Sequence, residues 1–201
     1  MRGILFAAIA VFFATQALGQ TPPPSPGPFG LTWGVTKAEV EGLGVQLSEV
    51  PQDNGWGKAF TARNLPKALG DMESAVLAFG YDDKLWRVGA VSKSWENDAY
   101  GSRAVARFDE LKGLLSERYG SGEPVMKRPA NEFYEKPDNF TYSLFLNERI
   151  HAWGWENADM DIEVSLRATN MSTIYYLLIY EYKPLRASVQ KSKKSQEKDA
   201  I

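Results

Sequence analysis

Three strand patterns follow one another near the end of the chain and constrain its fold more than any other feature. They are predicted over residues 149–156, 161–167 and 173–182. The middle pattern alternates polar residues with Ile162, Val164 and Leu166, as expected for a strand with one buried and one solvated face. The last pattern is apolar on both faces, which indicates a central strand or one that another element covers. Together the three predict consecutive strands of an antiparallel sheet.

A β-hairpin is predicted further upstream. Residues 75–81 and 84–92 are its strands, and Asp82 and Asp83 form its turn. A turn of two residues fixes the register and leaves Arg87 on the reverse face of the hairpin. The pairs expected on the apolar face are Phe79 with Trp86, Leu77 with Val88 and Ala75 with Ala90.

A capping box marks the start of the first predicted helix. Thr36 and Glu39 have the Thr-x-x-Glu spacing of this motif, and Gly44 ends the helix. Trp33 precedes the cap, where we expect it to anchor the entering chain against the sheet. A first strand is predicted over residues 56–62.

The hydrophobic period is helical between residues 97 and 119, and Gly120 follows as a stop. Residues 138–146 fit either a short helix or a strand. The order of helix, strands, helix and strands predicts an α+β fold, with helices packed on one face of an antiparallel sheet and with room for two helix-then-strands halves. The apolar positions of the long helix are Val105, Phe108, Leu111, Leu115 and Tyr119.

Residues 1–19 have the pattern of a secretory signal peptide, and cleavage is expected after Gly19 or within two residues of it. The apolar run from Ile4 to Ala14 is about half of what a membrane-spanning helix needs, so an uncleaved anchor is the less favoured alternative. Residues 20–28 are proline-rich and are predicted to be an extended linker. A single globular domain is expected over residues 29–183.

The composition limits the possible cellular compartments and the classes of partner. The chain has no cysteine, which excludes disulfides, thiol catalysis and a lipid-modified cysteine, and favours a bacterial periplasm. Residues 20–182 contain 16 Lys or Arg and 23 Asp or Glu, so nucleic-acid binding by charge is not expected. Residues 184–201 are predicted to be a disordered basic tail that could contact an anionic surface. Its lysines are Lys191, Lys193, Lys194 and Lys198.

No assembled catalytic set is apparent, and no metal or cofactor site is expected. His151 is the only histidine, and it alternates with Trp153 and Trp155 on one face of a predicted strand. Ser102 and Ser121 lie in ordinary turns without a nucleophile elbow. Paired carboxylates are conceivable in so acidic a chain, which leaves a glycan or peptide hydrolase as the alternative function.

Residues 34–44 (Gly-Val-Thr-Lys-Ala-Glu-Val-Glu-Gly-Leu-Gly) resemble the helix start of small bacterial envelope domains. These domains are the SmpA/OmlA-type lipoprotein of outer-membrane assembly and the β-lactamase inhibitor proteins. The resemblance implies helices packed on one face of an antiparallel sheet, and a role in binding other proteins. The chain departs from the lipoprotein because it has no lipid-accepting cysteine and a longer second half.

The leading hypothesis is therefore an exported, non-enzymatic domain that binds a protein or cell-envelope partner through the open face or edge of its sheet. Strand alternation places Arg87, Glu163 and Arg167 on the polar face, with Trp155 or Tyr175 beside them. Arginine and aromatic side chains are enriched at the energetic centres of interfaces, so these five residues are the predicted partner surface.

Overall fold

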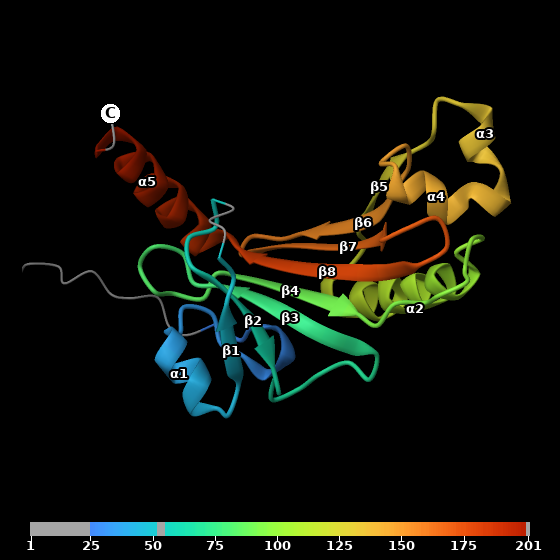
Figure 1. The fold of residues 1–201 in the computed structure, drawn as a ribbon. Helices are drawn as coiled ribbons and strands as arrows, with labels where there is room; N and C mark the ends of the chain where they lie inside the picture. The colour runs from blue at the N-terminus through green and yellow to red at the C-terminus, as the bar shows by residue number, and fades with distance from the viewer. Residues whose placement is uncertain (1–24, 52–54, 200–201) are drawn as a thin grey trace, which may run out of the picture.

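The computed structural model describes residues 25–51 and 55–199 (Figure 1). The predicted signal peptide and residues 20–24 of the predicted linker lie outside the described residues. The described chain forms one eight-stranded antiparallel sheet with helices packed against it, which confirms the predicted α+β class. Among the described residues, no helix combines the length and the apolar character that crossing a membrane requires.

The sheet consists of two four-stranded meanders, each of which follows a helix. The first unit is α1 (Lys37–Gly42), β1 (Gln46–Glu49), β2 (Ala59–Arg63), β3 (Met72–Ala78) and β4 (Arg87–Ser92). The second is α2 (Ser102–Tyr119), β5 (Glu123–Lys127), β6 (Ile150–Glu156), β7 (Met160–Ala168) and β8 (Ile174–Tyr182). The strand order is β1-β2-β3-β4-β8-β7-β6-β5, so the last strands of the two meanders pair antiparallel at the centre.

One face of the sheet, the core face, carries most of the buried apolar side chains. Leu77, Val88, Val164 and Leu178 come from four neighbouring central strands, and each is at most 2% exposed. Helix α2 covers this face with Phe108, and α1 adds Val40 to the same cluster. The long helix thus buries the predicted apolar side, although it begins at Ser102 rather than near residue 97.

The predicted capping box of α1 is present. The Thr36 hydroxyl accepts a hydrogen bond from the Glu39 N–H at 3.3 Å, and the Glu39 carboxylate accepts one from the Thr36 N–H at 2.7 Å. These bonds to Thr36 lower the pKa of Glu39. Trp33 is buried and stacks on Tyr182 with 5.6 Å between ring centroids, as expected for an anchor.

The predicted β3–β4 hairpin has the predicted register in its strands but not at its end. Ala75 pairs with Ala90, and Ala78 pairs with Arg87. Trp86, however, packs with Ala78 on the opposite face from Phe79, so the expected pairing of these two aromatics is wrong. The turn is wider than two residues because Gly80 and Asp83 both adopt positive φ angles, of 64° and 53°, and they redirect the chain before β4 begins.

The segment that sequence patterns left open is helical. It comprises α3 (Glu132–Glu135), the 3₁₀ turn η2 (Pro137–Asn139) and α4 (Phe140–Phe145), and α4 packs on β7 from the core face. Strands β1 and β5 were not predicted. Both lie at sheet edges and are largely exposed, so their sequences lack the alternation that a buried face imposes.

The domain extends beyond both of its predicted boundaries. Ser25 accepts a hydrogen bond from the Trp33 N–H at 2.9 Å, and Pro28, in the 3₁₀ turn η1 (Pro28–Gly30), is buried, so residues 25–28 belong to the fold and not to a free linker. Residues 184–199 are not a disordered tail, because they lie in helix α5 (Lys183–Asp199). Val189 of α5 is buried against Trp86, and the rest of α5 extends away from the sheet (Figure 1).

Candidate binding surface

Four of the five predicted partner residues lie on one face of the sheet, which we call the open face because it is opposite the core face. Arg87 on β4, Glu163 and Arg167 on β7, and Tyr175 on β8 occupy the strand positions that alternate with buried core residues. Tyr175 and Arg167 are direct cross-strand partners. Strand alternation alone therefore predicted correctly that these four residues share one face of the sheet.

Trp155 does not belong to the surface predicted for it. It pairs with Ile162 across β6 and β7, points to the core face and is only 4% exposed. His151 and Trp153 share that side of β6. The three residues share one face, as strand alternation predicted. Trp155 lies opposite the buried Ile162, so this face is the core face.

The middle of the open face is apolar and half-exposed. Helices α1, α2 and α4 pack on the core face, and α5 covers only the corner of the open face around Ala59, Ala78 and Trp86. Gly89 and Gly154 add no side chain to this surface. The apolar side chains form a central strip across three adjacent strands: Val76, Val91, Leu177 and Ile179.

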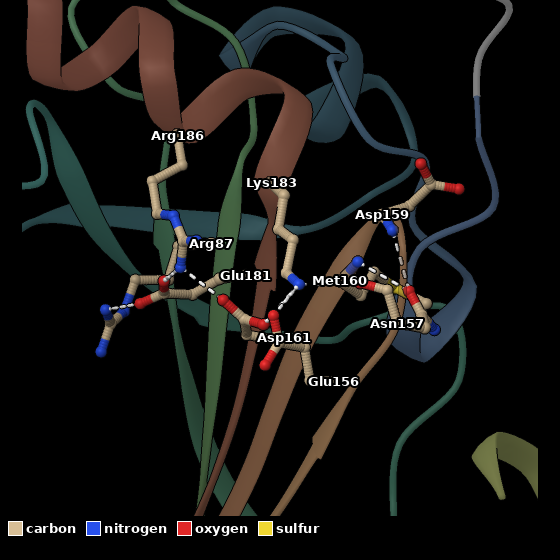
Figure 2. A network of polar contacts seen from close by, with 9 residues as sticks. All are labelled: Arg87, Glu156, Asn157, Asp159, Met160, Asp161, Glu181, Lys183 and Arg186. Carbon is tan, nitrogen blue, oxygen red and sulfur yellow. Dashed lines mark hydrogen bonds and ion pairs between the residues drawn. The ribbon is translucent and has the colours of Figure 1, made fainter.

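A row of charged residues borders the central strip on the side of α5 (Figure 2). Arg87 pairs with Glu181 on the neighbouring strand, and Glu181 lies opposite Asp161 on the next. Arg186 of α5 binds both carboxylates, with 3.2 Å between its Nη1 and Oε2 of Glu181. We call the following set the ion row: Arg87, Glu156, Asp161, Glu181, Lys183 and Arg186.

The ion row fixes the start of α5 to the sheet. Lys183 Nζ lies 2.6 Å from Oε1 of Glu156 and 3.1 Å from Oδ1 of Asp161, and its backbone N–H donates to the carbonyl of Asp159 at 2.8 Å. The hydrogen bond to Glu156 is the main cause that raises the pKa of Lys183. A further hydrogen bond joins the Ser188 hydroxyl to Asp82, in the turn before β4. Because these contacts come from residues far apart in sequence, composition alone predicted a tail where the chain forms a docked helix.

Burial and ion pairing act in opposite directions on Arg87. Burial lowers the pKa of its guanidinium, and the charges of Glu181 and Glu163 oppose that effect. Arg87 also lies over the Trp56 ring, 4.3 Å from its centroid. These contacts hold the guanidinium in one place, so Arg87 is a rigid edge of the open face.

On β7, which flanks the strip, the charges are looser. Glu163 and Arg167 are 3.9 Å apart, and their side chains are 37% and 43% exposed. Exposed pairs of this kind contribute roughly 0–1 kcal/mol to stability. Both side chains can therefore exchange their mutual contact for contacts with a partner at little cost.

The remaining candidates for chemistry have structural surroundings. His151 is half-buried, with its ring centroid 4.7 Å from that of Phe108 and 5.6 Å from that of Phe140, and burial lowers its pKa. The Ser102 N–H donates to Asp98, whose carboxylate caps α2. Within residues 25–51 and 55–199, no cluster of three or more His, Asp or Glu residues is arranged to hold a metal ion.

Comparison with known proteins adds no relative. No model of a known protein family, no curated protein and no solved structure matches the chain.

Proposed function

We propose that the protein is an exported binding domain that recognises a protein partner of the bacterial cell envelope through the open face of its sheet. The observation that carries this proposal is the central strip, whose four half-exposed apolar side chains are bordered by the ion row and, on β7, by the Glu163 and Arg167 pair. An apolar centre with a charged rim is the common anatomy of protein interfaces. The resemblance of residues 34–44 to envelope domains that bind proteins supports the same reading.

The geometry gives the alternative hydrolase no support. The carboxylates that lie close together on the open face are paired with cations. Asp161 and Glu181 bind the guanidinium of Arg186, and Glu156 and Asp161 bind Lys183. The groove beside α2 has no lining carboxylate, and the hollow beside β2 and β3 has one, Glu73. A glycosidase-type mechanism requires two carboxyl groups facing a cleft.

Site-specific photo-crosslinking in a Gram-negative host tests the open face. A photoreactive amino acid at Leu177 is expected to give a discrete protein adduct in the periplasmic fraction. The same amino acid at Tyr100, which is 61% exposed away from this face, is the matched control. Equal adducts from both positions, or none from Leu177, would contradict the proposal.

Export has its own test. The intact mass of the periplasmic form should correspond to cleavage after Gly19 or within two residues of it. Recovery of only full-length, membrane-retained protein would show that residues 1–19 act as an anchor.

The projecting part of α5 supplies a second contact with the envelope in this proposal. Lys191, Lys194 and Lys198 line one shallow hollow of the helix, so they present positive charge together. Each lysine contributes about 1 kcal/mol near an anionic surface. Co-sedimentation with phosphatidylglycerol vesicles should therefore weaken when these three residues are changed to glutamine, and raising the salt concentration should have the same effect.

A further inference from the structure

A groove lies on the core face, on the far side of the sheet from the proposed partner surface. It has a volume of about 340 Å³ and runs between the second half of α2, η1 and the loop that precedes β3. Its floor is formed by Leu178 and Tyr180. Both belong to β8, one of the strands over which α2 packs (Figure 1). The volume is at the small end of the range for small-molecule sites, about 300–1,000 Å³.

The wall of the groove on the α2 side is apolar. Leu111 and Leu115 are buried, whereas Leu114, which also lines the groove, is 56% exposed. Leu69 and Phe29 form the opposite wall. A leucine this exposed on a helix that otherwise follows its amphipathic pattern indicates that the apolar surface continues out of the core and into the groove.

Two tyrosines line one end of the groove. The Tyr180 and Tyr119 rings make edge contact, with 6.4 Å between their centroids. Burial raises the pKa of both hydroxyls, so they remain neutral hydrogen-bond donors at physiological pH.

The mouth of the groove is positively charged. Lys67 and Arg118 line both the groove and an adjoining polar hollow beneath residues 26–32. Both are exposed, and no ion pair within 4.0 Å between described residues involves either of them. The Arg118 guanidinium lies over the Tyr119 ring, 5.3 Å from its centroid. No Asp or Glu lines either hollow, although the chain as a whole is acidic. Two cations without a carboxylate partner, at the end of an apolar groove, are complementary to an amphiphile with a negative head group.

We propose that this groove binds one amphiphilic carboxylate with a single acyl chain, with the chain along Leu111, Leu114 and Leu178 and the head group at Lys67 and Arg118. The size of the groove favours a single chain over the two of a phospholipid. The site is separate from the open face, so an amphiphile and a protein partner can bind at the same time.

Isothermal titration calorimetry of the purified protein with decanoate tests the proposal. Saturable binding at one site is expected. The Lys67→Glu/Arg118→Glu variant should bind decanoate about tenfold more weakly, and its binding of the uncharged 1-decanol should not change. A matched control, Lys58→Glu/Arg128→Glu, makes the same change in net charge at two exposed positions that do not line the groove, and it should bind like wild type.

A second variant tests the acyl-chain contact. Leu114→Asp should weaken binding of both decanoate and 1-decanol, whereas Leu43→Asp, at an equally exposed leucine away from the groove, should not. Because both leucines are exposed, circular dichroism should show that both variants fold. The proposal is overturned if decanoate binding does not saturate, or if the two charge-reversal variants lose affinity equally.

Discussion

The two faces of the central strands differ in the interactions that stabilise their side chains. On the core face, side chains such as Tyr176 and Val164 are fully buried, and helices cover them. On the open face, the same strands carry the half-exposed central strip and side chains held mainly by ion pairs. Since burial supplies most of the folding free energy, the core face fixes the fold, and the open face is free to vary for recognition.

The largest loss of stability is expected from a substitution on the core face. Phe108 is 1% exposed at the centre of α2, so Phe108→Ala should reduce the free energy of unfolding by about 3–5 kcal/mol. Urea denaturation of the variant and wild type measures the difference. A loss below 1 kcal/mol would mean that α2 contributes little to the core and that the contrast between the faces is wrong.

A polar cluster at the edge of the core face gives the next largest effect. Arg107 donates two hydrogen bonds to Asp71, at 2.8 and 3.1 Å, and the Tyr176 hydroxyl donates a third at 3.0 Å. Burial opposes ionisation of Asp71, but these bonds prevail and lower its pKa. Asp71→Asn should therefore cost about 1–3 kcal/mol at pH 7.

The same variant has a defined pH dependence. A lowered folded pKa gives stability that is present above the unfolded pKa of about 3.9 and is lost as the pH falls through the folded value. The difference between Asp71→Asn and wild type should thus shrink below pH 4, as measured by urea denaturation across pH. Asp138→Asn, at an exposed carboxylate, is the control and should show no such convergence.

The capping box of α1 should have a smaller effect. Thr36→Ala removes the acceptor for the Glu39 N–H, so we expect a loss of about 1 kcal/mol in the free energy of unfolding. Denaturation alongside Phe108→Ala gives the ranking directly. If Thr36→Ala proves the more damaging, the short first helix matters more to the fold than the long second one.

Sequence patterns correctly predicted the features that depend on residues close together in the chain. The alternation in β7 and the Thr36 to Glu39 spacing each identified an element, and strand alternation placed Arg87 and Tyr175 on the open face. Patterns failed where the decisive contact is distant. Val189 of α5 packs against Trp86, which lies about a hundred residues earlier in the chain, and composition does not predict that contact.

The candidate sites divide in the same way. Arg167 and Tyr175 follow from strand period, because a strand exposes every second residue. The central strip could not be predicted without knowing that β4 and β8 are neighbours, because their pairing places Val91 beside Leu177. The groove required the packing of α2 over β8 beside η1, so Lys67 and Arg118 had no shared signal in the sequence.

The smallest effect on stability is expected on the open face, where it is also the most informative. Exchanging the two charges in Glu163→Arg/Arg167→Glu keeps an exposed ion pair at the same place and reverses its direction. The exchange also reverses the Glu163 charge that acts on Arg87, but solvent screens that charge because the Glu163 side chain is 37% exposed. Stability should therefore stay within about 0.5 kcal/mol of wild type. This exchange is a cleaner test than reversing Arg87, whose half-buried pair with Glu181 contributes to the docking of α5.

If the open face recognises a partner, the same exchange should reduce the Leu177 photo-adduct, because the partner then meets reversed charges beside the central strip. A folded, equally stable variant that still gives the wild-type adduct would exclude Glu163 and Arg167 from the interface. In that case recognition would rest on the strip and the ion row alone, and Val91→Ser, at the cross-strand partner of position 177, should abolish the photo-adduct where the charge exchange does not.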